Sequence, residues 1–231
     1  GNDISYGGKG NDILSGNADD DTLYGDDDED SLGGGSDYLY GGLGSDKLYG
    51  GSGNDYLYAG KDQNGNGDKS KNTLKGGAGE DYLYGDAGDD ILEGGTDNDT
   101  LRGNGGWDIY DGGDGLDTYE TDGHGEIRDS DRKGSINGKT ISGGKRDPEK
   151  DPKNTYYDSS NNKFVLDEKS GKLVINGELE IPGFKNGDFG IHIDDKKKDE
   201  EPETPPLAYP RESTPSFDKA SKQSSPIVLD L

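Results

Sequence analysis

The chain has no cysteine among its 231 residues, and only 25% of those residues are hydrophobic. The absence of cysteine excludes a disulfide framework and any thiolate metal site. No apolar run approaches the roughly 18 residues of a membrane-spanning helix, so no transmembrane segment is expected. The apolar content is too low for a conventional core, and composition alone predicts an acidic, glycine-rich, disordered linker.

Positive charge is also scarce, since 25 Lys and Arg residues face 50 Asp and Glu residues, for a net charge of −25. This balance excludes nucleic acid as a natural partner, because phosphate would be repelled, and it favours cations. The imbalance is concentrated in residues 1–120, where 28 acidic and 7 basic residues give a balance of −21. The first half must therefore bind cations or repel itself.

Glycine is abundant, with 42 residues, and it recurs with a period of nine. The segment 7–15 reads GGKGNDILS, and 41–49 reads GGLGSDKLY. The shared pattern is G-G-x-G-x-D-x-(large apolar)-x, and roughly twelve such units lie between Gly7 and Glu120. One unit, near residues 33–35, is a residue short, and another carries an insertion over 59–75.

Each unit predicts a six-residue turn followed by a three-residue strand. Glycines at positions one, two and four suit a turn with positive φ and close backbone packing. The residues after the aspartate form a short strand with one inward side chain. The expected inward residues are Leu14, Leu23, Leu32, Leu39, Leu48, Leu57, Leu74, Leu83, Leu92, Leu101, Tyr110 and Tyr119.

This array resembles the RTX (repeats-in-toxin) family, whose repeat is G-G-x-G-x-D-x-U-x. The resemblance covers about half of the chain and implies an all-β fold, a right-handed parallel β-roll. Two repeats would make one 18-residue turn, with strands on two faces and several calcium ions in the turns.

The turns offer aspartate carboxylates and backbone carbonyls, which are the hard oxygen ligands that Ca²⁺ prefers. Zinc or copper would require His or Cys, and the chain has two His and no Cys. The expected carboxylate ligands are Asp12, Asp21, Asp30, Asp37, Asp46, Asp55, Asp81, Asp90, Asp99, Asp108 and Asp117. The turn glycines expected around the ions are Gly8, Gly10, Gly42, Gly44, Gly51, Gly53, Gly77, Gly79, Gly88, Gly95, Gly113 and Gly115.

The resemblance further implies that aspartates two repeats apart share an ion. On that basis Asp46 is expected to pair with Asp30, and Asp55 with Asp37. Asp81, Asp99 and Asp117 would form one column, and Asp90 and Asp108 would belong to the other. Asn72 stands in the sixth position of the inserted unit, so that turn lacks a carboxylate.

The core predicted from these repeats is too small to fold the chain by itself. Burying one leucine contributes roughly 1.5–3 kcal/mol, whereas ordering nine residues costs about 1–2 kcal/mol each in backbone entropy. Ion binding must supply the difference, so we expect folding and calcium binding to be one event.

Tyrosine has a second order within the repeats. Counting repeats places Tyr6, Tyr24, Tyr40, Tyr58 and Tyr84 on one face, joined by Tyr38, Tyr56 and Tyr82, with Tyr49 opposite. One interpretation is an aromatic ladder that stabilises the thin core, and the other is a surface for a protein partner or ligand.

The insertion is open to two interpretations as well. Its opening, 62–67, resembles a D-x-N-x-N-G calcium loop, but Thr73 stands where the bidentate acid belongs. It is either an extra ion site or a plain excursion.

The period stops near Thr121, and residues 121–195 predict a small β cap over the open edge of the roll. Short strands are expected at 164–166, 173–175, 179–181 and 190–193. Residues 196–231 are charged and Pro-rich and predict a disordered tail. Its apolar end, 225–231, is either a secretion signal or the first strand of another domain.

No H-E-x-x-H or G-x-S-x-G motif occurs, and the carboxylates are in register with the glycine turns, so the chain is not expected to be an enzyme. We expect a module that folds on extracellular calcium and supports export of a larger secreted protein, with the type I secretion apparatus as the partner implied by the resemblance. The alternatives are a calcium-stiffened spacer or adhesion segment of a bacterial surface protein, and the C-terminal module of a secreted hydrolase or pore-forming toxin.

Overall fold

The computed structural model describes residues 1–27, 34–60, 68–137, 145–146, 152–186, 188–191 and 193–195. The chain divides into two compact units, 1–196 and 197–231, and all described residues belong to the first. The predicted disordered tail, Asp30, Leu32 and the opening of the insertion at 62–67 lie outside the described residues. No helix within the described part is long and apolar enough to cross a membrane.

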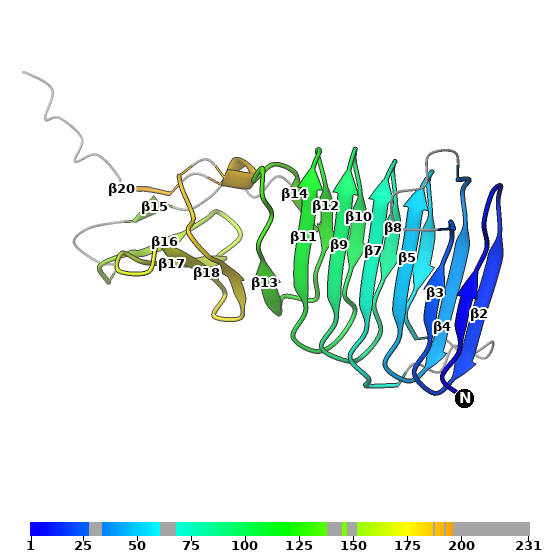
Figure 1. Cartoon of the computed structure of the whole chain (residues 1–231). Helices are drawn as coiled ribbons and strands as arrows, with labels where there is room; N and C mark the ends of the chain where they lie inside the picture. Colours follow the sequence, from blue (N-terminus) through cyan, green and yellow to red (C-terminus); the bar gives the residue numbers. More distant parts are fainter. Residues whose placement is uncertain are drawn as a thin grey trace, which may run out of the picture. The chain divides into compact units, whose positions relative to one another are not determined.

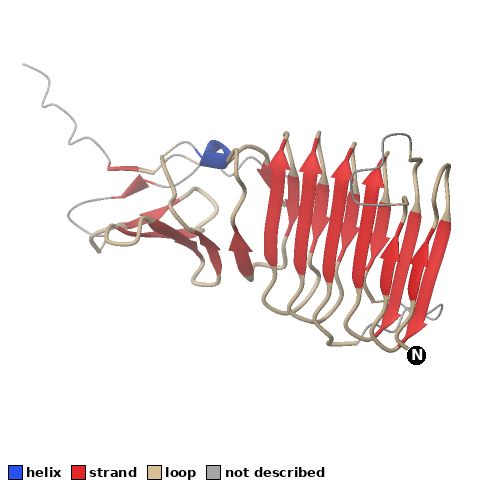
Figure 2. Cartoon of the chain, viewed as in Figure 1, coloured by secondary structure: helices blue, strands red, loops and turns tan. Residues whose placement is uncertain are grey.

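The repeats form a parallel β-roll, as predicted, and successive strands alternate between two sheets (Figures 1 and 2). The first sheet contains the roll strands β1 (Ile4–Tyr6), β3 (Thr22–Tyr24), β5 (Lys47–Ser52), β7 (Thr73–Ala78), β9 (Ile91–Thr96), β11 (Ile109–Asp114) and β13 (Gly125–Ile127). The second sheet consists of β2 (Ile13–Ala18), β4 (Tyr38–Leu43), β6 (Tyr56–Tyr58), β8 (Tyr82–Tyr84), β10 (Thr100–Arg102), β12 (Thr118–Glu120) and β14 (Ser135–Ile136). All pairings between these strands are parallel.

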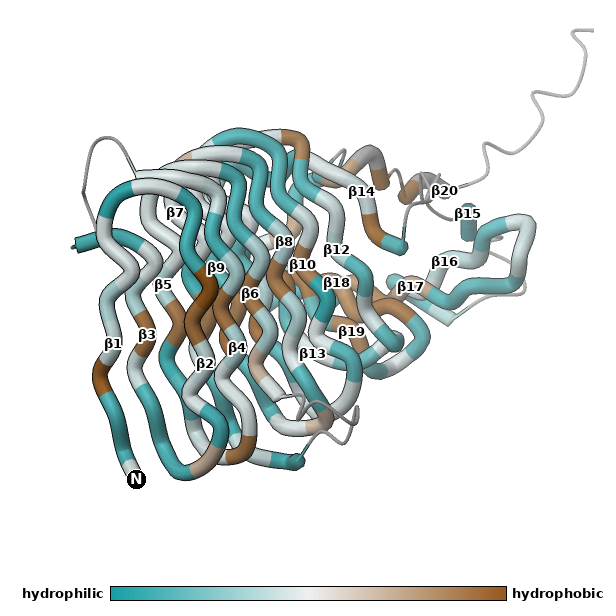
Figure 3. The backbone as a smooth tube through the Cα atoms, turned by 90° about the vertical axis from the view of Figure 1, so that its right-hand side faces the viewer, coloured by the Kyte–Doolittle hydropathy of each residue, from teal (hydrophilic) through white to brown (hydrophobic). Residues whose placement is uncertain are grey.

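The core is a stack of single inward side chains, one for each strand. Leucines at the eighth repeat position lie directly opposite one another, as Leu39 does to Leu57 and Leu74 to Leu92. The leucines from Leu23 to Leu101 in the described ladder are fully buried, and Tyr110 and Tyr119 continue the stack with no exposed surface. Figure 3 shows these apolar positions aligned along successive strands. Because side chains alternate between faces along a strand, the seventh and ninth positions face outward.

Within the repeats that end at Glu120, the ladder departs from the 18-residue period at two places. Leu14 pairs with Leu39 and Leu23 with Leu48, which is a step of 25 residues. β2 and β4 are direct neighbours, as are β3 and β5, so no strand lies between the members of either pair. The second departure is a step of 26 residues across the insertion, from Leu48 to Leu74 and from Leu57 to Leu83.

The first departure overturns the predicted tyrosine faces. Tyr6 and Tyr24 lie on the first sheet, where Tyr6 stacks on Tyr24 and Tyr24 stacks on Tyr49, each at a centroid distance of 4.8 Å. The second sheet carries two ladders, one of Tyr38, Tyr56 and Tyr82 and one of Tyr40, Tyr58 and Tyr84. The rings in all three ladders are within 9° of parallel.

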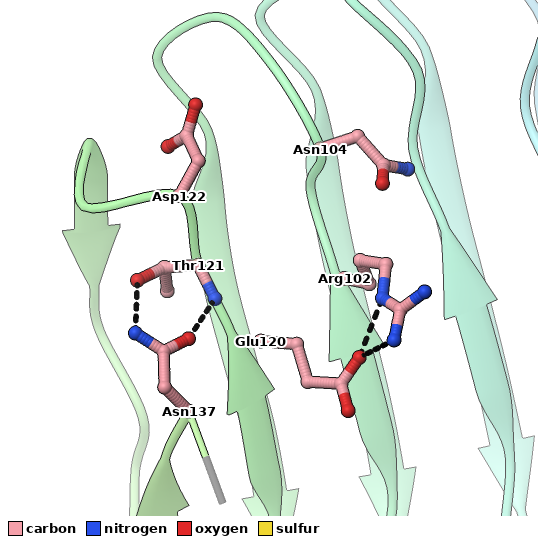
Figure 4. A pocket seen from close by; sticks show the side chains of 6 residues that line it. All are labelled: Arg102, Asn104, Glu120, Thr121, Asp122 and Asn137. Atoms are coloured by element: carbon pink, nitrogen blue, oxygen red, sulfur yellow. Dashed lines mark hydrogen bonds and ion pairs between the residues drawn. The ribbon is translucent and has the colours of Figure 1, made fainter.

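The roll runs one turn beyond the point where the sequence period stops. Ile127 pairs opposite Tyr110, and Ile136 opposite Tyr119, and both isoleucines are buried. Asn137 joins this last turn to the preceding one, because its side-chain oxygen accepts a hydrogen bond from the backbone amide of Thr121 at 2.8 Å. Figure 4 shows this contact beside a shallow surface pocket, where Arg102 pairs with Glu120.

Beyond this turn, the first sheet continues into further strands. β19 (Leu179–Ile181) pairs with β13, and the order then runs through β18 (Lys172–Ile175), β17 (Lys163–Asp167), β16 (Thr155–Tyr157), β15 (Lys145–Arg146) and β20 (Asp194–Asp195). These strands pair antiparallel from β19 to β15, while the β13–β19 and β15–β20 pairs are parallel. Three of the four strands expected here are confirmed. The strand expected at 190–193 is wrong, because η1 (Asp188–Gly190) turns the chain there and places Phe189 edge-on against Tyr119.

Candidate metal sites

The turns align the sixth-position residues in two columns along the roll. One column contains Asp12, Asp37, Asp55, Asp81, Asp99 and Asp117, and the other contains Asp3, Asp21, Asp46, Asn72, Asp90 and Asp108. Within each column the backbone N–H of one residue donates to the side-chain Oδ1 of the residue one turn further on, at 2.7–2.9 Å. Each carboxylate is thus fixed in orientation by its neighbouring turn.

These columns show which of the aspartates that were expected to pair are neighbours along the roll. Asp55 accepts from Asp37, and Asp81, Asp99 and Asp117 follow one another, as expected. Asp90 and Asp108 belong to the other column. Asp46 accepts the amide of Asp21 across the 25-residue step, and Asp30, its expected partner, lies outside the described residues.

The second oxygen of most column carboxylates has no hydrogen-bond donor. The buried Oδ2 atoms without a partner belong to Asp12, Asp21, Asp37, Asp46, Asp55, Asp81, Asp99 and Asp117. Two members of the other column differ: Asp90 Oδ2 accepts the Asp86 amide at 2.8 Å, and Asp108 Oδ2 accepts the Tyr110 hydroxyl at 3.2 Å. A buried carboxylate oxygen without a donor is costly, and a cation is the partner that would compensate it.

The first glycine of each unit lets this oxygen approach the backbone. A Cβ on Gly76 would lie 2.3 Å from Asp81 Oδ2 and 2.7 Å from the Gly94 carbonyl oxygen, and Gly50 is placed in the same way against Asp55 and Gly76. A carboxylate of one unit and a carbonyl of the next turn therefore meet where only glycine leaves space. Both oxygens are hard ligands of the kind that calcium prefers.

The other predicted turn glycines have the backbone conformation that was expected at most positions. Positive φ is found at Gly8, Gly10, Gly42, Gly44, Gly51, Gly53, Gly77, Gly79, Gly95 and Gly113. Gly88 and Gly115 lack it, but a Cβ at either would meet a backbone carbonyl at 1.8–1.9 Å. In the described residues no three His, Cys, Asp or Glu side chains gather into one group that could hold a metal ion.

The raised pKa values of the buried column carboxylates also favour the binding of a cation. Burial, together with repulsion from neighbouring carboxylates, raises the pKa of Asp81 to about 9 and that of Asp99 to about 8. Burial likewise raises the pKa of Asp55 and of Asp108 to about 7. Since an adjacent positive charge favours the ionised form, a bound divalent ion would reverse this penalty.

Several acidic residues in the turns were missed by the repeat pattern. Asp3 is the sixth position of an incomplete unit before Gly7, and it donates to Asp21. Asp26 and Asp86 replace the second glycine of their units and are buried, each with one oxygen unpartnered. Asp129, also buried with an unpartnered oxygen, lies beyond the last regular repeat and accepts from Gly113. Reading the second position for acids would have found Asp26 and Asp86, whereas Asp129 had no periodic signal.

Asn72 fits its column without a carboxylate. Its side-chain oxygen accepts the Asp46 amide at 2.8 Å, and its Nδ2 donates to Ser70 O and Asp90 Oδ1 at 3.3 and 3.1 Å. An amide thus provides the donor that the aspartates lack, at the expense of one anionic oxygen.

A parallel β-roll whose turns carry two columns of buried, oriented carboxylates beside backbone carbonyls is a calcium-binding repeat module. The model of the RTX calcium-binding nonapeptide repeat matches in four copies, over residues 1–32, 33–65, 66–101 and 85–119, and the chain belongs to this family. The family is a structural rather than a catalytic repeat and is typical of secreted bacterial proteins. Comparison with curated proteins and with solved structures gave no match.

The raised pKa values predict an unusual pH dependence for the roll without calcium. The ordinary pKa of an aspartate is 3.8, and those of Asp81 and Asp99 are raised to about 9 and about 8. Between about pH 4 and pH 9 the folded roll therefore holds more protons than the unfolded chain. Stability of the calcium-free roll is therefore greatest at low pH and is lost as pH rises through the folded pKa values. In chelator, far-UV circular dichroism should show more β structure at pH 5 than at pH 8. A gain of β structure on raising the pH would contradict this.

Proposed function

We propose that this chain is a calcium-driven folding module of a larger secreted protein, with the column aspartates and turn carbonyls as its ligands. Where calcium is scarce, inside the cell, the chain is unfolded and can be threaded through a type I secretion apparatus. Outside the cell, calcium at about 10⁻⁴–10⁻³ M folds the chain. The folded chain can then no longer move back into the cell. The observation that carries the proposal is the series of eight buried column oxygens that have no donor.

The chain's own residues prepare these sites for the ion. The amide-to-Oδ1 hydrogen bonds hold each carboxylate and leave Oδ2 for the ion, and the glycines exclude side chains from the same place. Bound calcium would supply the positive charge that permits the carboxylates to remain ionised when buried.

We further propose three functional regions: the roll at 1–120, the cap at 121–195 and a tail at 196–231. Strands β13 and β14 of the second region extend the ladder, and the antiparallel strands then cover its edge. Covering an open edge prevents further strand addition, which a solenoid requires for solubility. No catalytic role is proposed for the chain, and an activity of the parent protein would reside elsewhere.

A second candidate function is a calcium-stiffened spacer or adhesion segment at a cell surface. Tyr38 and Tyr82 are 39% and 36% exposed, so the second sheet does present aromatic surface. The rings, however, stack on one another at about the strand spacing, which supports a mainly stabilising role.

Asp81→Asn tests the proposal, because its sign should depend on calcium. The variant keeps an Oδ1 acceptor for Asp55 and places an amide where the unpartnered oxygen lay, as Asn72 does naturally. In calcium titrations followed by circular dichroism, we expect a midpoint about tenfold higher, equivalent to about 1.4 kcal/mol. In chelator the variant should be no less structured than the original chain.

Asp97→Asn is the matched control. Asp97 is an exposed turn residue with φ of 76°, a conformation that asparagine also adopts. Its titration should match that of the original chain. Equal calcium midpoints for the Asp81 and Asp97 variants would refute a role of the columns in binding.

A further inference from the structure

The column that contains Asp21 changes its hydrogen-bond partners along the roll. Asp21 and Asp46, in its N-terminal half, each have a buried Oδ2 with no donor. From Asn72 onward, every side-chain oxygen of this column accepts a hydrogen bond from the protein. In the other column an Oδ2 without a donor recurs in each turn from Asp12 to Asp117. The two edges of the roll therefore differ in their C-terminal half.

Asp108 is the clearest case, because a side chain of the core supplies its donor. Its Oδ1 accepts the Asp90 amide at 2.9 Å, and its Oδ2 accepts the Tyr110 hydroxyl at 3.2 Å. Asp108 and Tyr110 are both fully buried, so bulk water does not reach the pair. Tyr110 stands at the inward position where most units have leucine, and a leucine side chain has no atom that could donate there.

The Tyr110 hydroxyl occupies the place that a backbone carbonyl has in the regular turns. At Gly76, a Cβ would meet the Oδ2 of the same unit and the carbonyl oxygen of the next turn. A Cβ on Gly103 would instead meet Asp108 Oδ2 at 1.9 Å and the Tyr110 hydroxyl at 2.3 Å, and no carbonyl is among its three nearest atoms. A neutral donor thus stands beside this carboxylate, where the regular turns have a second hard acceptor.

A second side-chain donor acts on the same edge of the roll. Asn104, in the loop after β10 (Figure 4), stands at the second position of its unit and has a φ of 75°. Its Nδ2 donates to the Gly85 carbonyl oxygen of the preceding turn at 2.8 Å. This is a first-position carbonyl, of the same kind as the Gly94 carbonyl that faces Asp81. Protein donors therefore join the turn at 103–108 to the turn before it.

We propose that the Tyr110 hydroxyl takes the place of a calcium ion at Asp108, so that Asp108 stands in the ligand column without being an ion ligand. Calcium needs six to eight oxygens with free lone pairs, and a carboxylate oxygen that already accepts a phenol proton offers fewer of them. Hydrogen bonds from Tyr110 and Asn104 hold this turn instead. Tyr110 is thereby a residue that determines which aspartates of the column bind calcium.

Tyr119 provides a matched comparison, because it is the next residue of the core stack and is also fully buried. Its hydroxyl accepts the Gly112 amide at 3.2 Å, while Asp117 Oδ2 has no donor. A tyrosine in the core is therefore not enough by itself to occupy the column oxygen. Asp117 should bind an ion, and Asp108 should not.

The test compares the calcium midpoints of Asp108→Asn and Asp117→Asn in the full chain, measured by circular dichroism. The asparagine at 108 keeps an acceptor for the Asp90 amide, and its Nδ2 can donate to the Tyr110 oxygen. We expect Asp108→Asn to leave the midpoint within about twofold of the original chain and Asp117→Asn to raise it about tenfold. An equal rise in both variants would overturn the proposal.

Tyr110→Leu restores the residue type of the regular repeat and gives a second readout. It frees Asp108 Oδ2, so native mass spectrometry at saturating calcium should count one ion more than in the original chain. The double variant with Asp108→Asn should return to the original count, because the added ion uses Asp108. A folded Tyr110→Leu chain with an unchanged count would overturn the role of the hydroxyl.

The inference rests on the proposed calcium binding, and the outcomes separate the two. A raised midpoint in Asp117→Asn, beside an equal rise in Asp108→Asn, would overturn only the substitution of an ion by Tyr110. Midpoints unchanged in both variants would remove the column carboxylates as ligands and with them the proposed function. A chain without any calcium transition would do the same.

Discussion

In chelator, the backbone amides of β5, β7, β9 and β11 are expected to exchange hydrogen nearly as fast as in an unfolded chain. With calcium at millimolar concentration, the same amides should exchange at least about 100-fold more slowly, since about 2.7 kcal/mol of coupled binding gives that factor. This is the largest effect expected for the molecule, because it involves the whole ladder and not a single turn.

The physical reason lies in the balance between a narrow core and buried charge. Each strand from β3 to β12 buries one leucine or tyrosine completely. Its contribution of roughly 1.5–3 kcal/mol is smaller than the entropy cost of ordering nine residues. Without ions, the aligned carboxylates add desolvation and mutual repulsion, as the raised pKa values of Asp81 and Asp99 indicate. The parallel strand pairing therefore lacks a sufficient driving force until calcium binds.

Mass-spectrometric hydrogen exchange resolves this effect by segment, with magnesium at the same concentration as control. Magnesium is smaller and demands octahedral geometry with retained water, so it should protect the ladder poorly. The fluorescence of Trp107, which directly precedes the column residue Asp108, should change over the same calcium range. Strong protection of the repeat strands in chelator would show that the core suffices without ions, and export by calcium-dependent folding would lose its basis.

Gly77→Ala is expected to destabilise the calcium-bound roll by more than about 3 kcal/mol. Gly77 has φ of +121°, and a Cβ there would lie 2.0 Å from the Gly51 carbonyl oxygen in the adjacent turn. The obstacle is backbone, which cannot move aside as a flexible side chain could. The neighbouring turns would have to move apart. The carboxylate and carbonyl oxygens that are proposed to bind calcium between them would then move apart as well.

Two other alanine substitutions divide this effect into its causes. At Gly10 a Cβ would meet nothing within 4 Å although φ is +100°, so Gly10→Ala measures the conformational cost alone, about 1–2 kcal/mol. Gly105 has neither the positive φ nor a contact closer than 3.4 Å, so Gly105→Ala should change stability by less than about 0.5 kcal/mol. Thermal unfolding at saturating calcium ranks the three. Equal losses at Gly77 and Gly10 would mean that close packing of turns adds nothing.

The repeat pattern predicted the roll, its inward leucines and most of the aspartate alignment because each depends on a local nine-residue rule. The count of repeats failed between β2 and β4, which are direct neighbours in the second sheet although residues 30 and 32 carry an aspartate and a leucine in the repeat register. The pairing of strands across 25 residues decides this, and a local pattern carries no information on it. The miscount placed Tyr6 and Tyr24 on the wrong face.

The extension of the ladder to Ile127 and Ile136 was hidden for a different reason. These residues lie 17 positions beyond their partners and follow turns without the double glycine. The pairing edge of the preceding turn, which exists only in the folded molecule, determines their place.

The amide-to-carboxylate bonds give the two columns a direction. In each bond the donor is the earlier residue and the acceptor belongs to the following turn, as from Asp55 to Asp81 and from Asp81 to Asp99. A turn added at the N-terminal edge therefore brings a backbone donor to a carboxylate already in place, whereas a turn added at the C-terminal edge brings a carboxylate to a backbone donor already in place. The two edges of the stack are thus chemically different: one presents carboxylate acceptors and the other presents backbone donors.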